Sequence, residues 1–150
     1  MDLQENENQK QVADYQAYLE LKKLHYTNTD IAKHLSYSKK ELGYLISRFT
    51  FATPLEYKLQ EQEGDYHFNG KFFITANAKS VLTSDEIQEI YAFTQQLVEQ
   101  HKGIDYLQVF YSIEQDCKLF FICNLSKKMI ESGNYSAEDN YCTLMLASDY

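Results

Sequence analysis

The chain has 150 residues, of which 44% are hydrophobic and 15% aromatic, and its formal net charge at pH 7 is −8. This length and apolar content fit one compact domain or two small modules and exclude wholesale disorder. No apolar run approaches the roughly 18 residues of a membrane span, and the start of the chain lacks the basic and apolar regions of a secretory signal. We therefore expect a cytoplasmic protein that does not contact membranes.

The basic residues are concentrated in one segment of this acidic chain. Residues 1–20 carry five acids against one lysine, residues 21–50 carry six bases against two acids, and residues 51–150 carry seven bases against fifteen acids. The overall charge argues against a simple nucleic-acid binder, but a local positive segment attracts phosphate. The alternative is that these lysines only solvate the polar faces of amphipathic helices.

The N-terminal region predicts a tail followed by a helix. Residues 1–9 are polar and acidic, so we expect a frayed tail there. Val12, Tyr15 and Tyr18 begin an apolar pattern that predicts a first helix over about residues 10–24. This helix is expected to pack over the two shorter helices that follow.

Residues 28–47 read as a helix, a tight turn and a second helix. Thr29 is placed to cap the first helix and Ser38 the second, because a short side-chain oxygen satisfies the exposed amides there. Ser36 lies in the turn between them. Apolar residues recur at helical spacing on both sides of this turn, at Ile31, Ala32 and Leu35 and then at Leu42, Leu45, Ile46 and Phe49.

This pattern resembles the helix-turn-helix of DNA-binding regulators, in which the second helix lies in the major groove. Ser36 holds the turn position that is usually Gly, and Gly43 lies inside the second helix, where it costs roughly 1 kcal/mol relative to Ala. The resemblance implies a three-helix head over residues 10–50 that binds double-stranded DNA. The residues expected at that interface are Thr27, Asn28, Lys33, Lys39, Lys40, Tyr44, Ser47 and Arg48.

Within this interface, the second helix is expected to read the DNA. Lys39 and Lys40 start that helix and can reach base edges or phosphate, while Tyr44 suits a thymine methyl group or a phosphate oxygen. The alternative for Tyr44 is a partly buried packing role. A single head with so few basic residues is expected to bind DNA weakly. A regulator of this kind is therefore expected to be a homodimer that occupies two half-sites.

A β region is expected after Pro54, the only proline. Leu55, Tyr57 and Leu59 alternate with polar residues, as in a half-buried strand. Asn69-Gly70, between residues 65–68 and 71–74, is a strong hairpin signal. Such a hairpin can be a DNA-contacting wing, but its acidic flanks favour a structural hairpin instead.

The remaining chain predicts one long helix and three more strands. Thr83 and Glu86 form a capping-box pattern, and Gly103 is the natural end of the helix that follows. Residues 106–113 and 117–123 predict an antiparallel hairpin, 126–130 a helical turn, 132–139 a polar loop and 141–146 a last strand. The fold class is α+β: the helical head, followed by an acidic α+β body over residues 51–150 with antiparallel strands and one long helix.

The sequence contains no recognisable motif for catalysis or cofactor binding. Cys117, Cys123 and Cys142 and the four histidines lack metal-ligand spacing, and the five glycines form no phosphate-binding loop. All three cysteines fall in or beside apolar strand patterns, which favours reduced, mostly buried thiols over an activated nucleophile. We therefore expect a non-enzyme without metal or cofactor.

Two segments of the body, GIDYLQVF at 103–110 and DNYCTLMLASDY at 139–150, resemble parts of small uncharacterised proteins of phages and mobile elements of Gram-positive bacteria. The combination of a helix-turn-helix head with an acidic body is similar to the layout of some two-module phage anti-CRISPR proteins. That layout implies a head that represses its own promoter and a body that inhibits a host nucleic-acid enzyme. Two alternatives remain: a plain regulator whose body dimerises or senses a ligand, and a protein-interaction module whose helix-turn-helix only packs.

Overall fold

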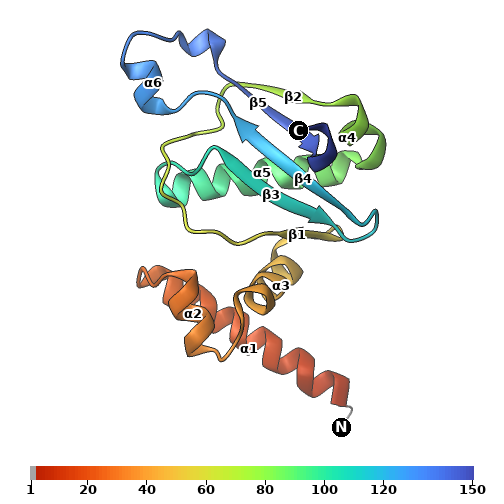
Figure 1. Ribbon diagram of the computed structural model, residues 1–150. Coiled ribbons are helices and arrows are strands. Elements are labelled where there is room, and N and C mark those ends of the chain that lie inside the picture. The colour runs from red at the N-terminus through yellow and green to blue at the C-terminus, as the bar shows by residue number, and fades with distance from the viewer. Residues whose placement is uncertain (1–2) are drawn as a thin grey trace. The chain divides into compact units, whose positions relative to one another are not determined.

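The computed structural model describes residues 3–150, with side chains from residue 6 onward (Figure 1). The chain divides into two compact units. One, here called the head, comprises the chain up to Ala52 together with Leu59–Glu61, and the other, the body, comprises Thr53–Lys58 and Gln62–Tyr150. Helices and a mixed five-stranded sheet confirm the α+β class.

Three helices form the head: α1 (Leu3–Lys23), α2 (Asn28–His34) and α3 (Lys39–Thr50). The prediction of a frayed tail is wrong for residues 3–9, which belong to α1, and for residues 1–2 it lies outside the described residues. Leucine, glutamine and glutamate in this segment are good helix formers. Its Asn8 side chain also accepts a hydrogen bond of 2.8 Å from the Arg48 guanidinium.

The turn between α2 and α3 has well-defined ends. Thr27, and not Thr29 as predicted, caps α2, because its hydroxyl accepts the Asp30 N–H at 3.1 Å. Ser38 caps α3 as predicted, and the Glu41 side chain completes a capping box. Ser36 adopts a left-handed φ of 60°, the conformation that explains the preference for Gly at such a turn.

The core of the head is a small apolar cluster. Tyr37, in the turn, is tied to α1 because its hydroxyl donates to the Asp14 carboxylate, which also accepts from Lys10 at 3.1 Å. The buried members are Ile31, Ala32, Leu42, Leu45 and Ile46, and the half-buried side chains against them are Tyr15, Tyr18, Leu21, Leu35, Tyr37, Phe49 and Leu59. The apolar spacing of α2 and α3 is therefore confirmed.

The body is built on a five-stranded sheet in the order β1-β3-β4-β5-β2. Its strands are β1 (Leu55–Tyr57), β2 (Lys71–Ile74), β3 (Leu107–Ser112), β4 (Cys117–Cys123) and β5 (Tyr141–Leu146). All neighbours pair antiparallel except β2 and β5, which are parallel. The β3–β4 hairpin and the last strand are confirmed, whereas the strand predicted through Leu59 ends at Tyr57 and Leu59 belongs to the head.

The hairpin predicted around Asn69-Gly70 is wrong, and with it the possible wing. Residues 71–74 form β2 beside β5, and Tyr66 instead bridges to Ile104. Gly70 is required by close approach: a Cβ at this position would lie 2.4 Å from the Asn140 carbonyl oxygen. The glycine signal was genuine, but it marks a contact between distant segments and not a turn.

Helix α5 (Ser84–His101) runs along one face of the sheet (Figure 1). The predicted Thr83–Glu86 capping box is present, and the helix ends at Lys102 and Gly103, which have φ of 58° and 125°. The helix packs through aromatic rings, with Phe93 4.7 Å from Tyr57 between ring centroids.

Short helical elements complete the described part of the body. Helix α4 (Ala76–Val81), which the sequence did not predict, precedes α5. The helical turn expected at 126–130 is α6 (Lys127–Glu131), and η1 (Ala137–Asp139) lies within the loop expected at 132–139. Both belong to a long segment between β4 and β5. The turn η2 (Ala147–Asp149) follows β5.

Candidate nucleic-acid interface

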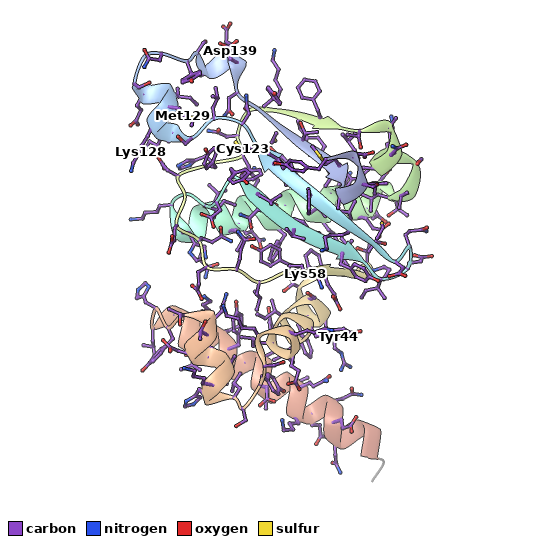
Figure 2. The ribbon with its side chains drawn as sticks, in the orientation of Figure 1. Tyr44, Lys58, Cys123, Lys128, Met129 and Asp139 are labelled. Atoms are coloured by element: carbon purple, nitrogen blue, oxygen red, sulfur yellow. The ribbon has the colours of Figure 1, made fainter. Side chains whose placement is uncertain are left out.

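One side of α3 presents a row of exposed side chains. Lys40, Tyr44 and Arg48 are exposed and follow each other at intervals of four residues, so they share one face of the helix. The side chain of Tyr44 is 55% exposed and leaves α3 away from the apolar cluster (Figure 2). We call Lys40, Tyr44 and Arg48 the α3 row. This exposure does not favour the alternative that Tyr44 is a partly buried packing residue.

Two lysines and one threonine extend this surface. Lys39 is exposed beside Lys40 in the first turn of α3, and Lys33 is exposed near the end of α2. Thr27 is also exposed, although its hydroxyl is engaged in capping α2. Cations at these positions suit phosphate contacts on either side of a helix that lies in a groove.

Asn28 and Ser47 do not belong to this surface, which corrects the prediction. Asn28 is 7% exposed in the first turn of α2, and Ser47 is 4% exposed on the inner side of α3. Gly43, four residues before Ser47, is buried as well. Two small residues at this spacing indicate a closely packed helix face, a signal in the sequence that the prediction overlooked.

Arg48 is held by a residue that the sequence analysis assigned to the tail. Its Nη2 donates to the Asn8 Oδ1 at 2.8 Å, and its guanidinium carbon lies 5.6 Å from the centre of the Phe49 ring. A guanidinium has five N–H donors in a fixed plane, so one bond to Asn8 orients it and leaves donors for phosphate. Asn8 is therefore a positioning residue for the α3 row.

An acidic side chain lies beside the α3 row. A cavity of about 270 Å³ in the head is lined by Gln11, Tyr37, Glu41, Tyr44, Leu45 and Arg48. The Ser38 N–H and hydroxyl lower the pKa of Glu41, which keeps this side chain ionised. Glu41 therefore places a carboxylate beside Tyr44 and Arg48, and a carboxylate repels phosphate but can accept a hydrogen bond from cytosine N4.

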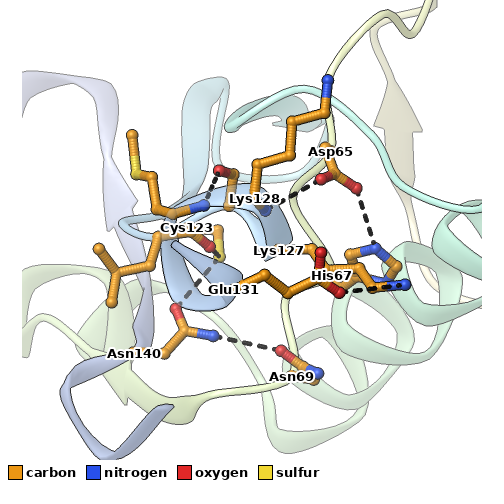
Figure 3. A network of polar contacts seen from close by, with 11 residues as sticks. Asp65, His67, Asn69, Cys123, Lys127, Lys128, Glu131 and Asn140 are labelled. Carbon is orange, nitrogen blue, oxygen red and sulfur yellow. Dashed lines mark hydrogen bonds and ion pairs between the residues drawn. The ribbon is translucent and has the colours of Figure 1, made fainter. Parts of the chain in front are cut away.

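The body contains a second cavity, of about 370 Å³, beside α6. Its lining residues are His67, Asn69, Leu125, Lys127, Ile130, Glu131, Ala137 and Asn140. The buried Asn140 side chain donates to Asn69 Oδ1 at 3.2 Å, and His67 Nε2 lies 3.3 Å from Asp65 Oδ1 (Figure 3). Amide, imidazole and charged groups thus border one hollow beside apolar side chains.

Several carboxylates of the body are engaged within the fold. Glu89 accepts the Thr53 hydroxyl at 3.0 Å, and Asp105 accepts the Glu63 N–H at 3.0 Å. Asp149 accepts from Asn77 and Thr75 at 2.7 and 2.9 Å, which lowers its pKa. Part of the acidic composition of the body is therefore structural.

The cysteines form no metal site. Cys123 and Cys142 are buried, as predicted, and Cys117 is partly buried; all three are free thiols. Within residues 3–150, no group of three or more Cys, His, Asp and Glu side chains is placed to hold a metal ion. No helix in the same range has the length and apolar character needed to cross a bilayer.

Comparisons with protein-family models, curated proteins and solved structures give no match to this chain. Neither the head nor the body is therefore assigned to a family.

Proposed function

We propose that the head binds double-stranded DNA and represses its own promoter, and that the acidic body binds and inhibits a host nucleic-acid enzyme such as a CRISPR nuclease. The layout is that of a phage or mobile-element protein. The observation that carries the DNA-binding proposal is the α3 row with Lys39, on a capped helix whose opposite face is buried in the head core.

In this proposal α3 lies in the major groove with its N-terminal end toward the bases. Lys39 and Lys40 contact base edges or phosphate, Tyr44 contacts a thymine methyl group, and Arg48 contacts phosphate. Lys33 and the Thr27 region contact the flanking backbone. The capping box at Ser38 keeps the first turn of α3 ordered, which reduces the entropy lost on binding.

The test is a titration of the full chain against a fluorescent duplex of its own upstream DNA and a scrambled duplex, at two salt concentrations. We expect salt-sensitive binding that prefers the upstream duplex. Lys39→Glu with Lys40→Glu should abolish it, because charge reversal repels phosphate while exposed helix positions contribute little to stability.

The matched control reverses two exposed lysines of the body, Lys79 and Lys118, to glutamate, which changes the net charge equally. Loss of binding in both double variants would show that only overall charge matters. Unchanged affinity in the head variant would refute the assignment of α3. Absence of binding at low salt would favour the third interpretation, in which the helix-turn-helix only packs.

The body proposal rests on its acidic excess and on aromatic side chains at one sheet edge. Phe73 of β2 and Tyr141 of β5 are exposed and stack edge-to-face with ring centroids 6.0 Å apart. Exposed aromatic side chains are enriched at protein-binding surfaces. The Lys39→Glu/Lys40→Glu variant separates the two functions, because it should still inhibit the nuclease although it no longer binds DNA.

A further pair of variants locates the surface. Phe73→Ala with Tyr141→Ala should weaken binding to the host enzyme by 2 kcal/mol or more, roughly the size of a hot-spot effect, and leave the DNA titration unchanged. Full inhibition by this variant would move the partner surface elsewhere on the body. We also expect the full chain to sediment as a homodimer when bound to two half-sites.

A second candidate is a plain regulator whose body senses a small ligand, and the 370 Å³ cavity beside α6 favours it. Cavities that bind small molecules are of this order of size and combine apolar walls with a few polar groups. Ala137→Trp, which narrows this cavity, should abolish any thermal shift produced by free amino acids or mononucleotides. If no such compound shifts the wild-type melting curve, this candidate loses its support.

A further inference from the structure

Two cysteines of the body face each other across neighbouring strands. In the antiparallel pairing of β4 and β5, Cys123 is directly opposite Cys142. Both side chains are buried on the same face of the sheet. Directly opposite residues on one face have the closest side chains in a sheet. The side chains of Cys123 and Cys142 are therefore neighbours in the core of the body.

The backbone hydrogen bonds show which kind of pair this is. The Cys123 N–H donates to the Tyr106 carbonyl at 2.9 Å, away from β5, whereas the next residue, Asn124, donates to the Tyr141 carbonyl at 3.1 Å. Hydrogen-bonded and non-hydrogen-bonded pairs alternate along an antiparallel ladder. Cys123 and Cys142 are therefore a non-hydrogen-bonded pair, in which the Cα atoms are about 4.5 Å apart, within the range that a disulfide spans.

The surroundings distinguish the two thiols. Cys123 Sγ lies 3.5 Å from the Leu125 carbonyl oxygen and 3.6 Å from Asn140 Oδ1, so these two acceptors share its one thiol hydrogen, and Asn140 borders the cavity beside α6 (Figure 3). Burial raises the pKa of Cys123, while hydrogen bonds with the backbone near Phe68 act in the opposite direction. Burial raises the pKa of Cys142 to about 12. Cys123 is thus the member of the pair whose contacts with Leu125 and Asn140 join it to the wall of the cavity.

We propose that Cys123 and Cys142 are a redox-active dithiol, which hydrogen peroxide converts to an intrachain disulfide between β4 and β5. The Cys123 thiolate attacks one peroxide oxygen, the O–O bond breaks, and the released hydroxide takes up a proton to leave as water. The sulfur of Cys142 then attacks the resulting sulfenic acid, loses its proton, and displaces the second oxygen as water. Two thiols are oxidised by two electrons, and one peroxide is reduced to two waters.

The disulfide changes the wall of the cavity. Its formation removes the thiol hydrogen that Cys123 donates to Asn140, so Asn140 Oδ1 loses a partner while its amide still donates to Asn69. The bond also ties together the two strand ends that bracket α6 and η1.

The test uses the full chain with Cys117→Ser, so that only the proposed pair remains. After peroxide treatment, unfolding in denaturant and alkylation, we expect a species that has lost the mass of two hydrogens and takes up no alkylating reagent. Reduction with dithiothreitol should restore two alkylatable thiols, and peptide mapping should join Cys123 to Cys142. Two thiols that stay alkylatable after peroxide, or disulfides only between chains, would overturn the proposal.

The control variant Cys117→Ser/Cys142→Ala removes the second sulfur. It should stop at a sulfenic acid on Cys123, which dimedone traps, and the reciprocal Cys117→Ser/Cys123→Ala variant should trap much less. Circular dichroism before oxidation establishes that each variant is folded. Equal trapping in the two variants would contradict the assignment of Cys123 as the attacking thiol.

Discussion

The head and the body use charged side chains in opposite ways. In the head, Lys33, Lys39 and Lys40 are exposed, so their charges are available to a ligand. In the body, Glu89, Asp105 and other acids accept hydrogen bonds that fix loops and helix ends. The overall charge of −8 therefore conceals two arrangements: exposed lysines lie on the surface of the head, while part of the negative charge of the body maintains its fold.

The two units also differ in how their cores are made. The head core is an aliphatic cluster with aromatic side chains at its margin. The body core is centred on rings, where Phe121 lies 4.8 Å from Phe68 and 5.6 Å from Phe72 between ring centroids. Removal of a large ring from the body should therefore be the most damaging single change, and its effect on the head tests whether the units are energetically separate.

Phe121→Ala should lower the unfolding free energy of the body by about 3–5 kcal/mol, because it removes a fully buried ring and leaves a cavity. Urea unfolding monitored by circular dichroism measures this loss. If the units are separate, the affinity of the head for DNA should change little where the body is still folded. A parallel loss of DNA affinity would mean that head and body unfold as one unit.

Gly70→Ala should cost about 1–3 kcal/mol, the usual range for forcing an extra methyl group into a packed site. The new Cβ meets the Asn140 carbonyl oxygen at 2.4 Å, so β2 must move away from β5. Hydrogen exchange should therefore accelerate in β2 and at the start of β5. If hydrogen exchange accelerated only in residues 65–74, the result would instead support the hairpin predicted around Asn69-Gly70.

Gly70 also shows where sequence-based prediction ends for this chain. The caps at Ser38 and Thr83 were predictable because their partners, Glu41 and Glu86, are three residues away. The pairing of β2 with β5 joins segments far apart in the sequence, and its only local trace is a glycine that equally fits a turn. Information of this kind is non-local, so periodicity and turn signals do not contain it.

The candidate interface follows the same rule. Helical periodicity predicted the exposure of Lys39, Lys40 and Tyr44 correctly, because the exposed side of a single helix follows from residue spacing. It failed at Ser47, whose burial depends on how α3 packs, and at Asn8, whose bond to Arg48 joins two helices. Lys33, Lys39 and Lys40 were accessible to sequence reasoning, whereas Asn8, which orients the guanidinium, was not.

The two capping boxes allow a matched comparison of head and body. Ser38→Ala and Thr83→Ala each remove the hydroxyl that accepts an N–H at 3.1 Å, so each should cost about 0.5–2 kcal/mol. Thr83→Ala should lie at the upper end, because its partner Glu86 is buried and Glu41 is exposed. Only Ser38→Ala should also weaken DNA binding, since only α3 carries the proposed interface. If both variants weakened DNA binding equally, the DNA affinity would not depend on the order of the first turn of α3.

The smallest expected effect is the titration of Glu41. Its folded-state pKa lies below the ordinary value because the Ser38 N–H and hydroxyl favour the carboxylate. A lowered folded pKa contributes stability at pH values above the unfolded value of about 4.3, and this contribution is lost as the pH falls through the folded value. The difference in stability between wild type and Glu41→Gln should therefore be constant at neutral pH and shrink in acid.

Asp149 provides the counterpart in the body, because Asn77 and Thr75 lower its pKa in the same way. Carboxyl NMR titrations should place both groups below their ordinary ranges. In the Ser38→Ala variant the pKa of Glu41 should rise while that of Asp149 stays where it was, since the two belong to different units. A Glu41 that titrates normally in the wild type would show that the capping box is open in solution. The first turn of α3 would then be ordered only by DNA, and the affinity would include the free energy of closing it.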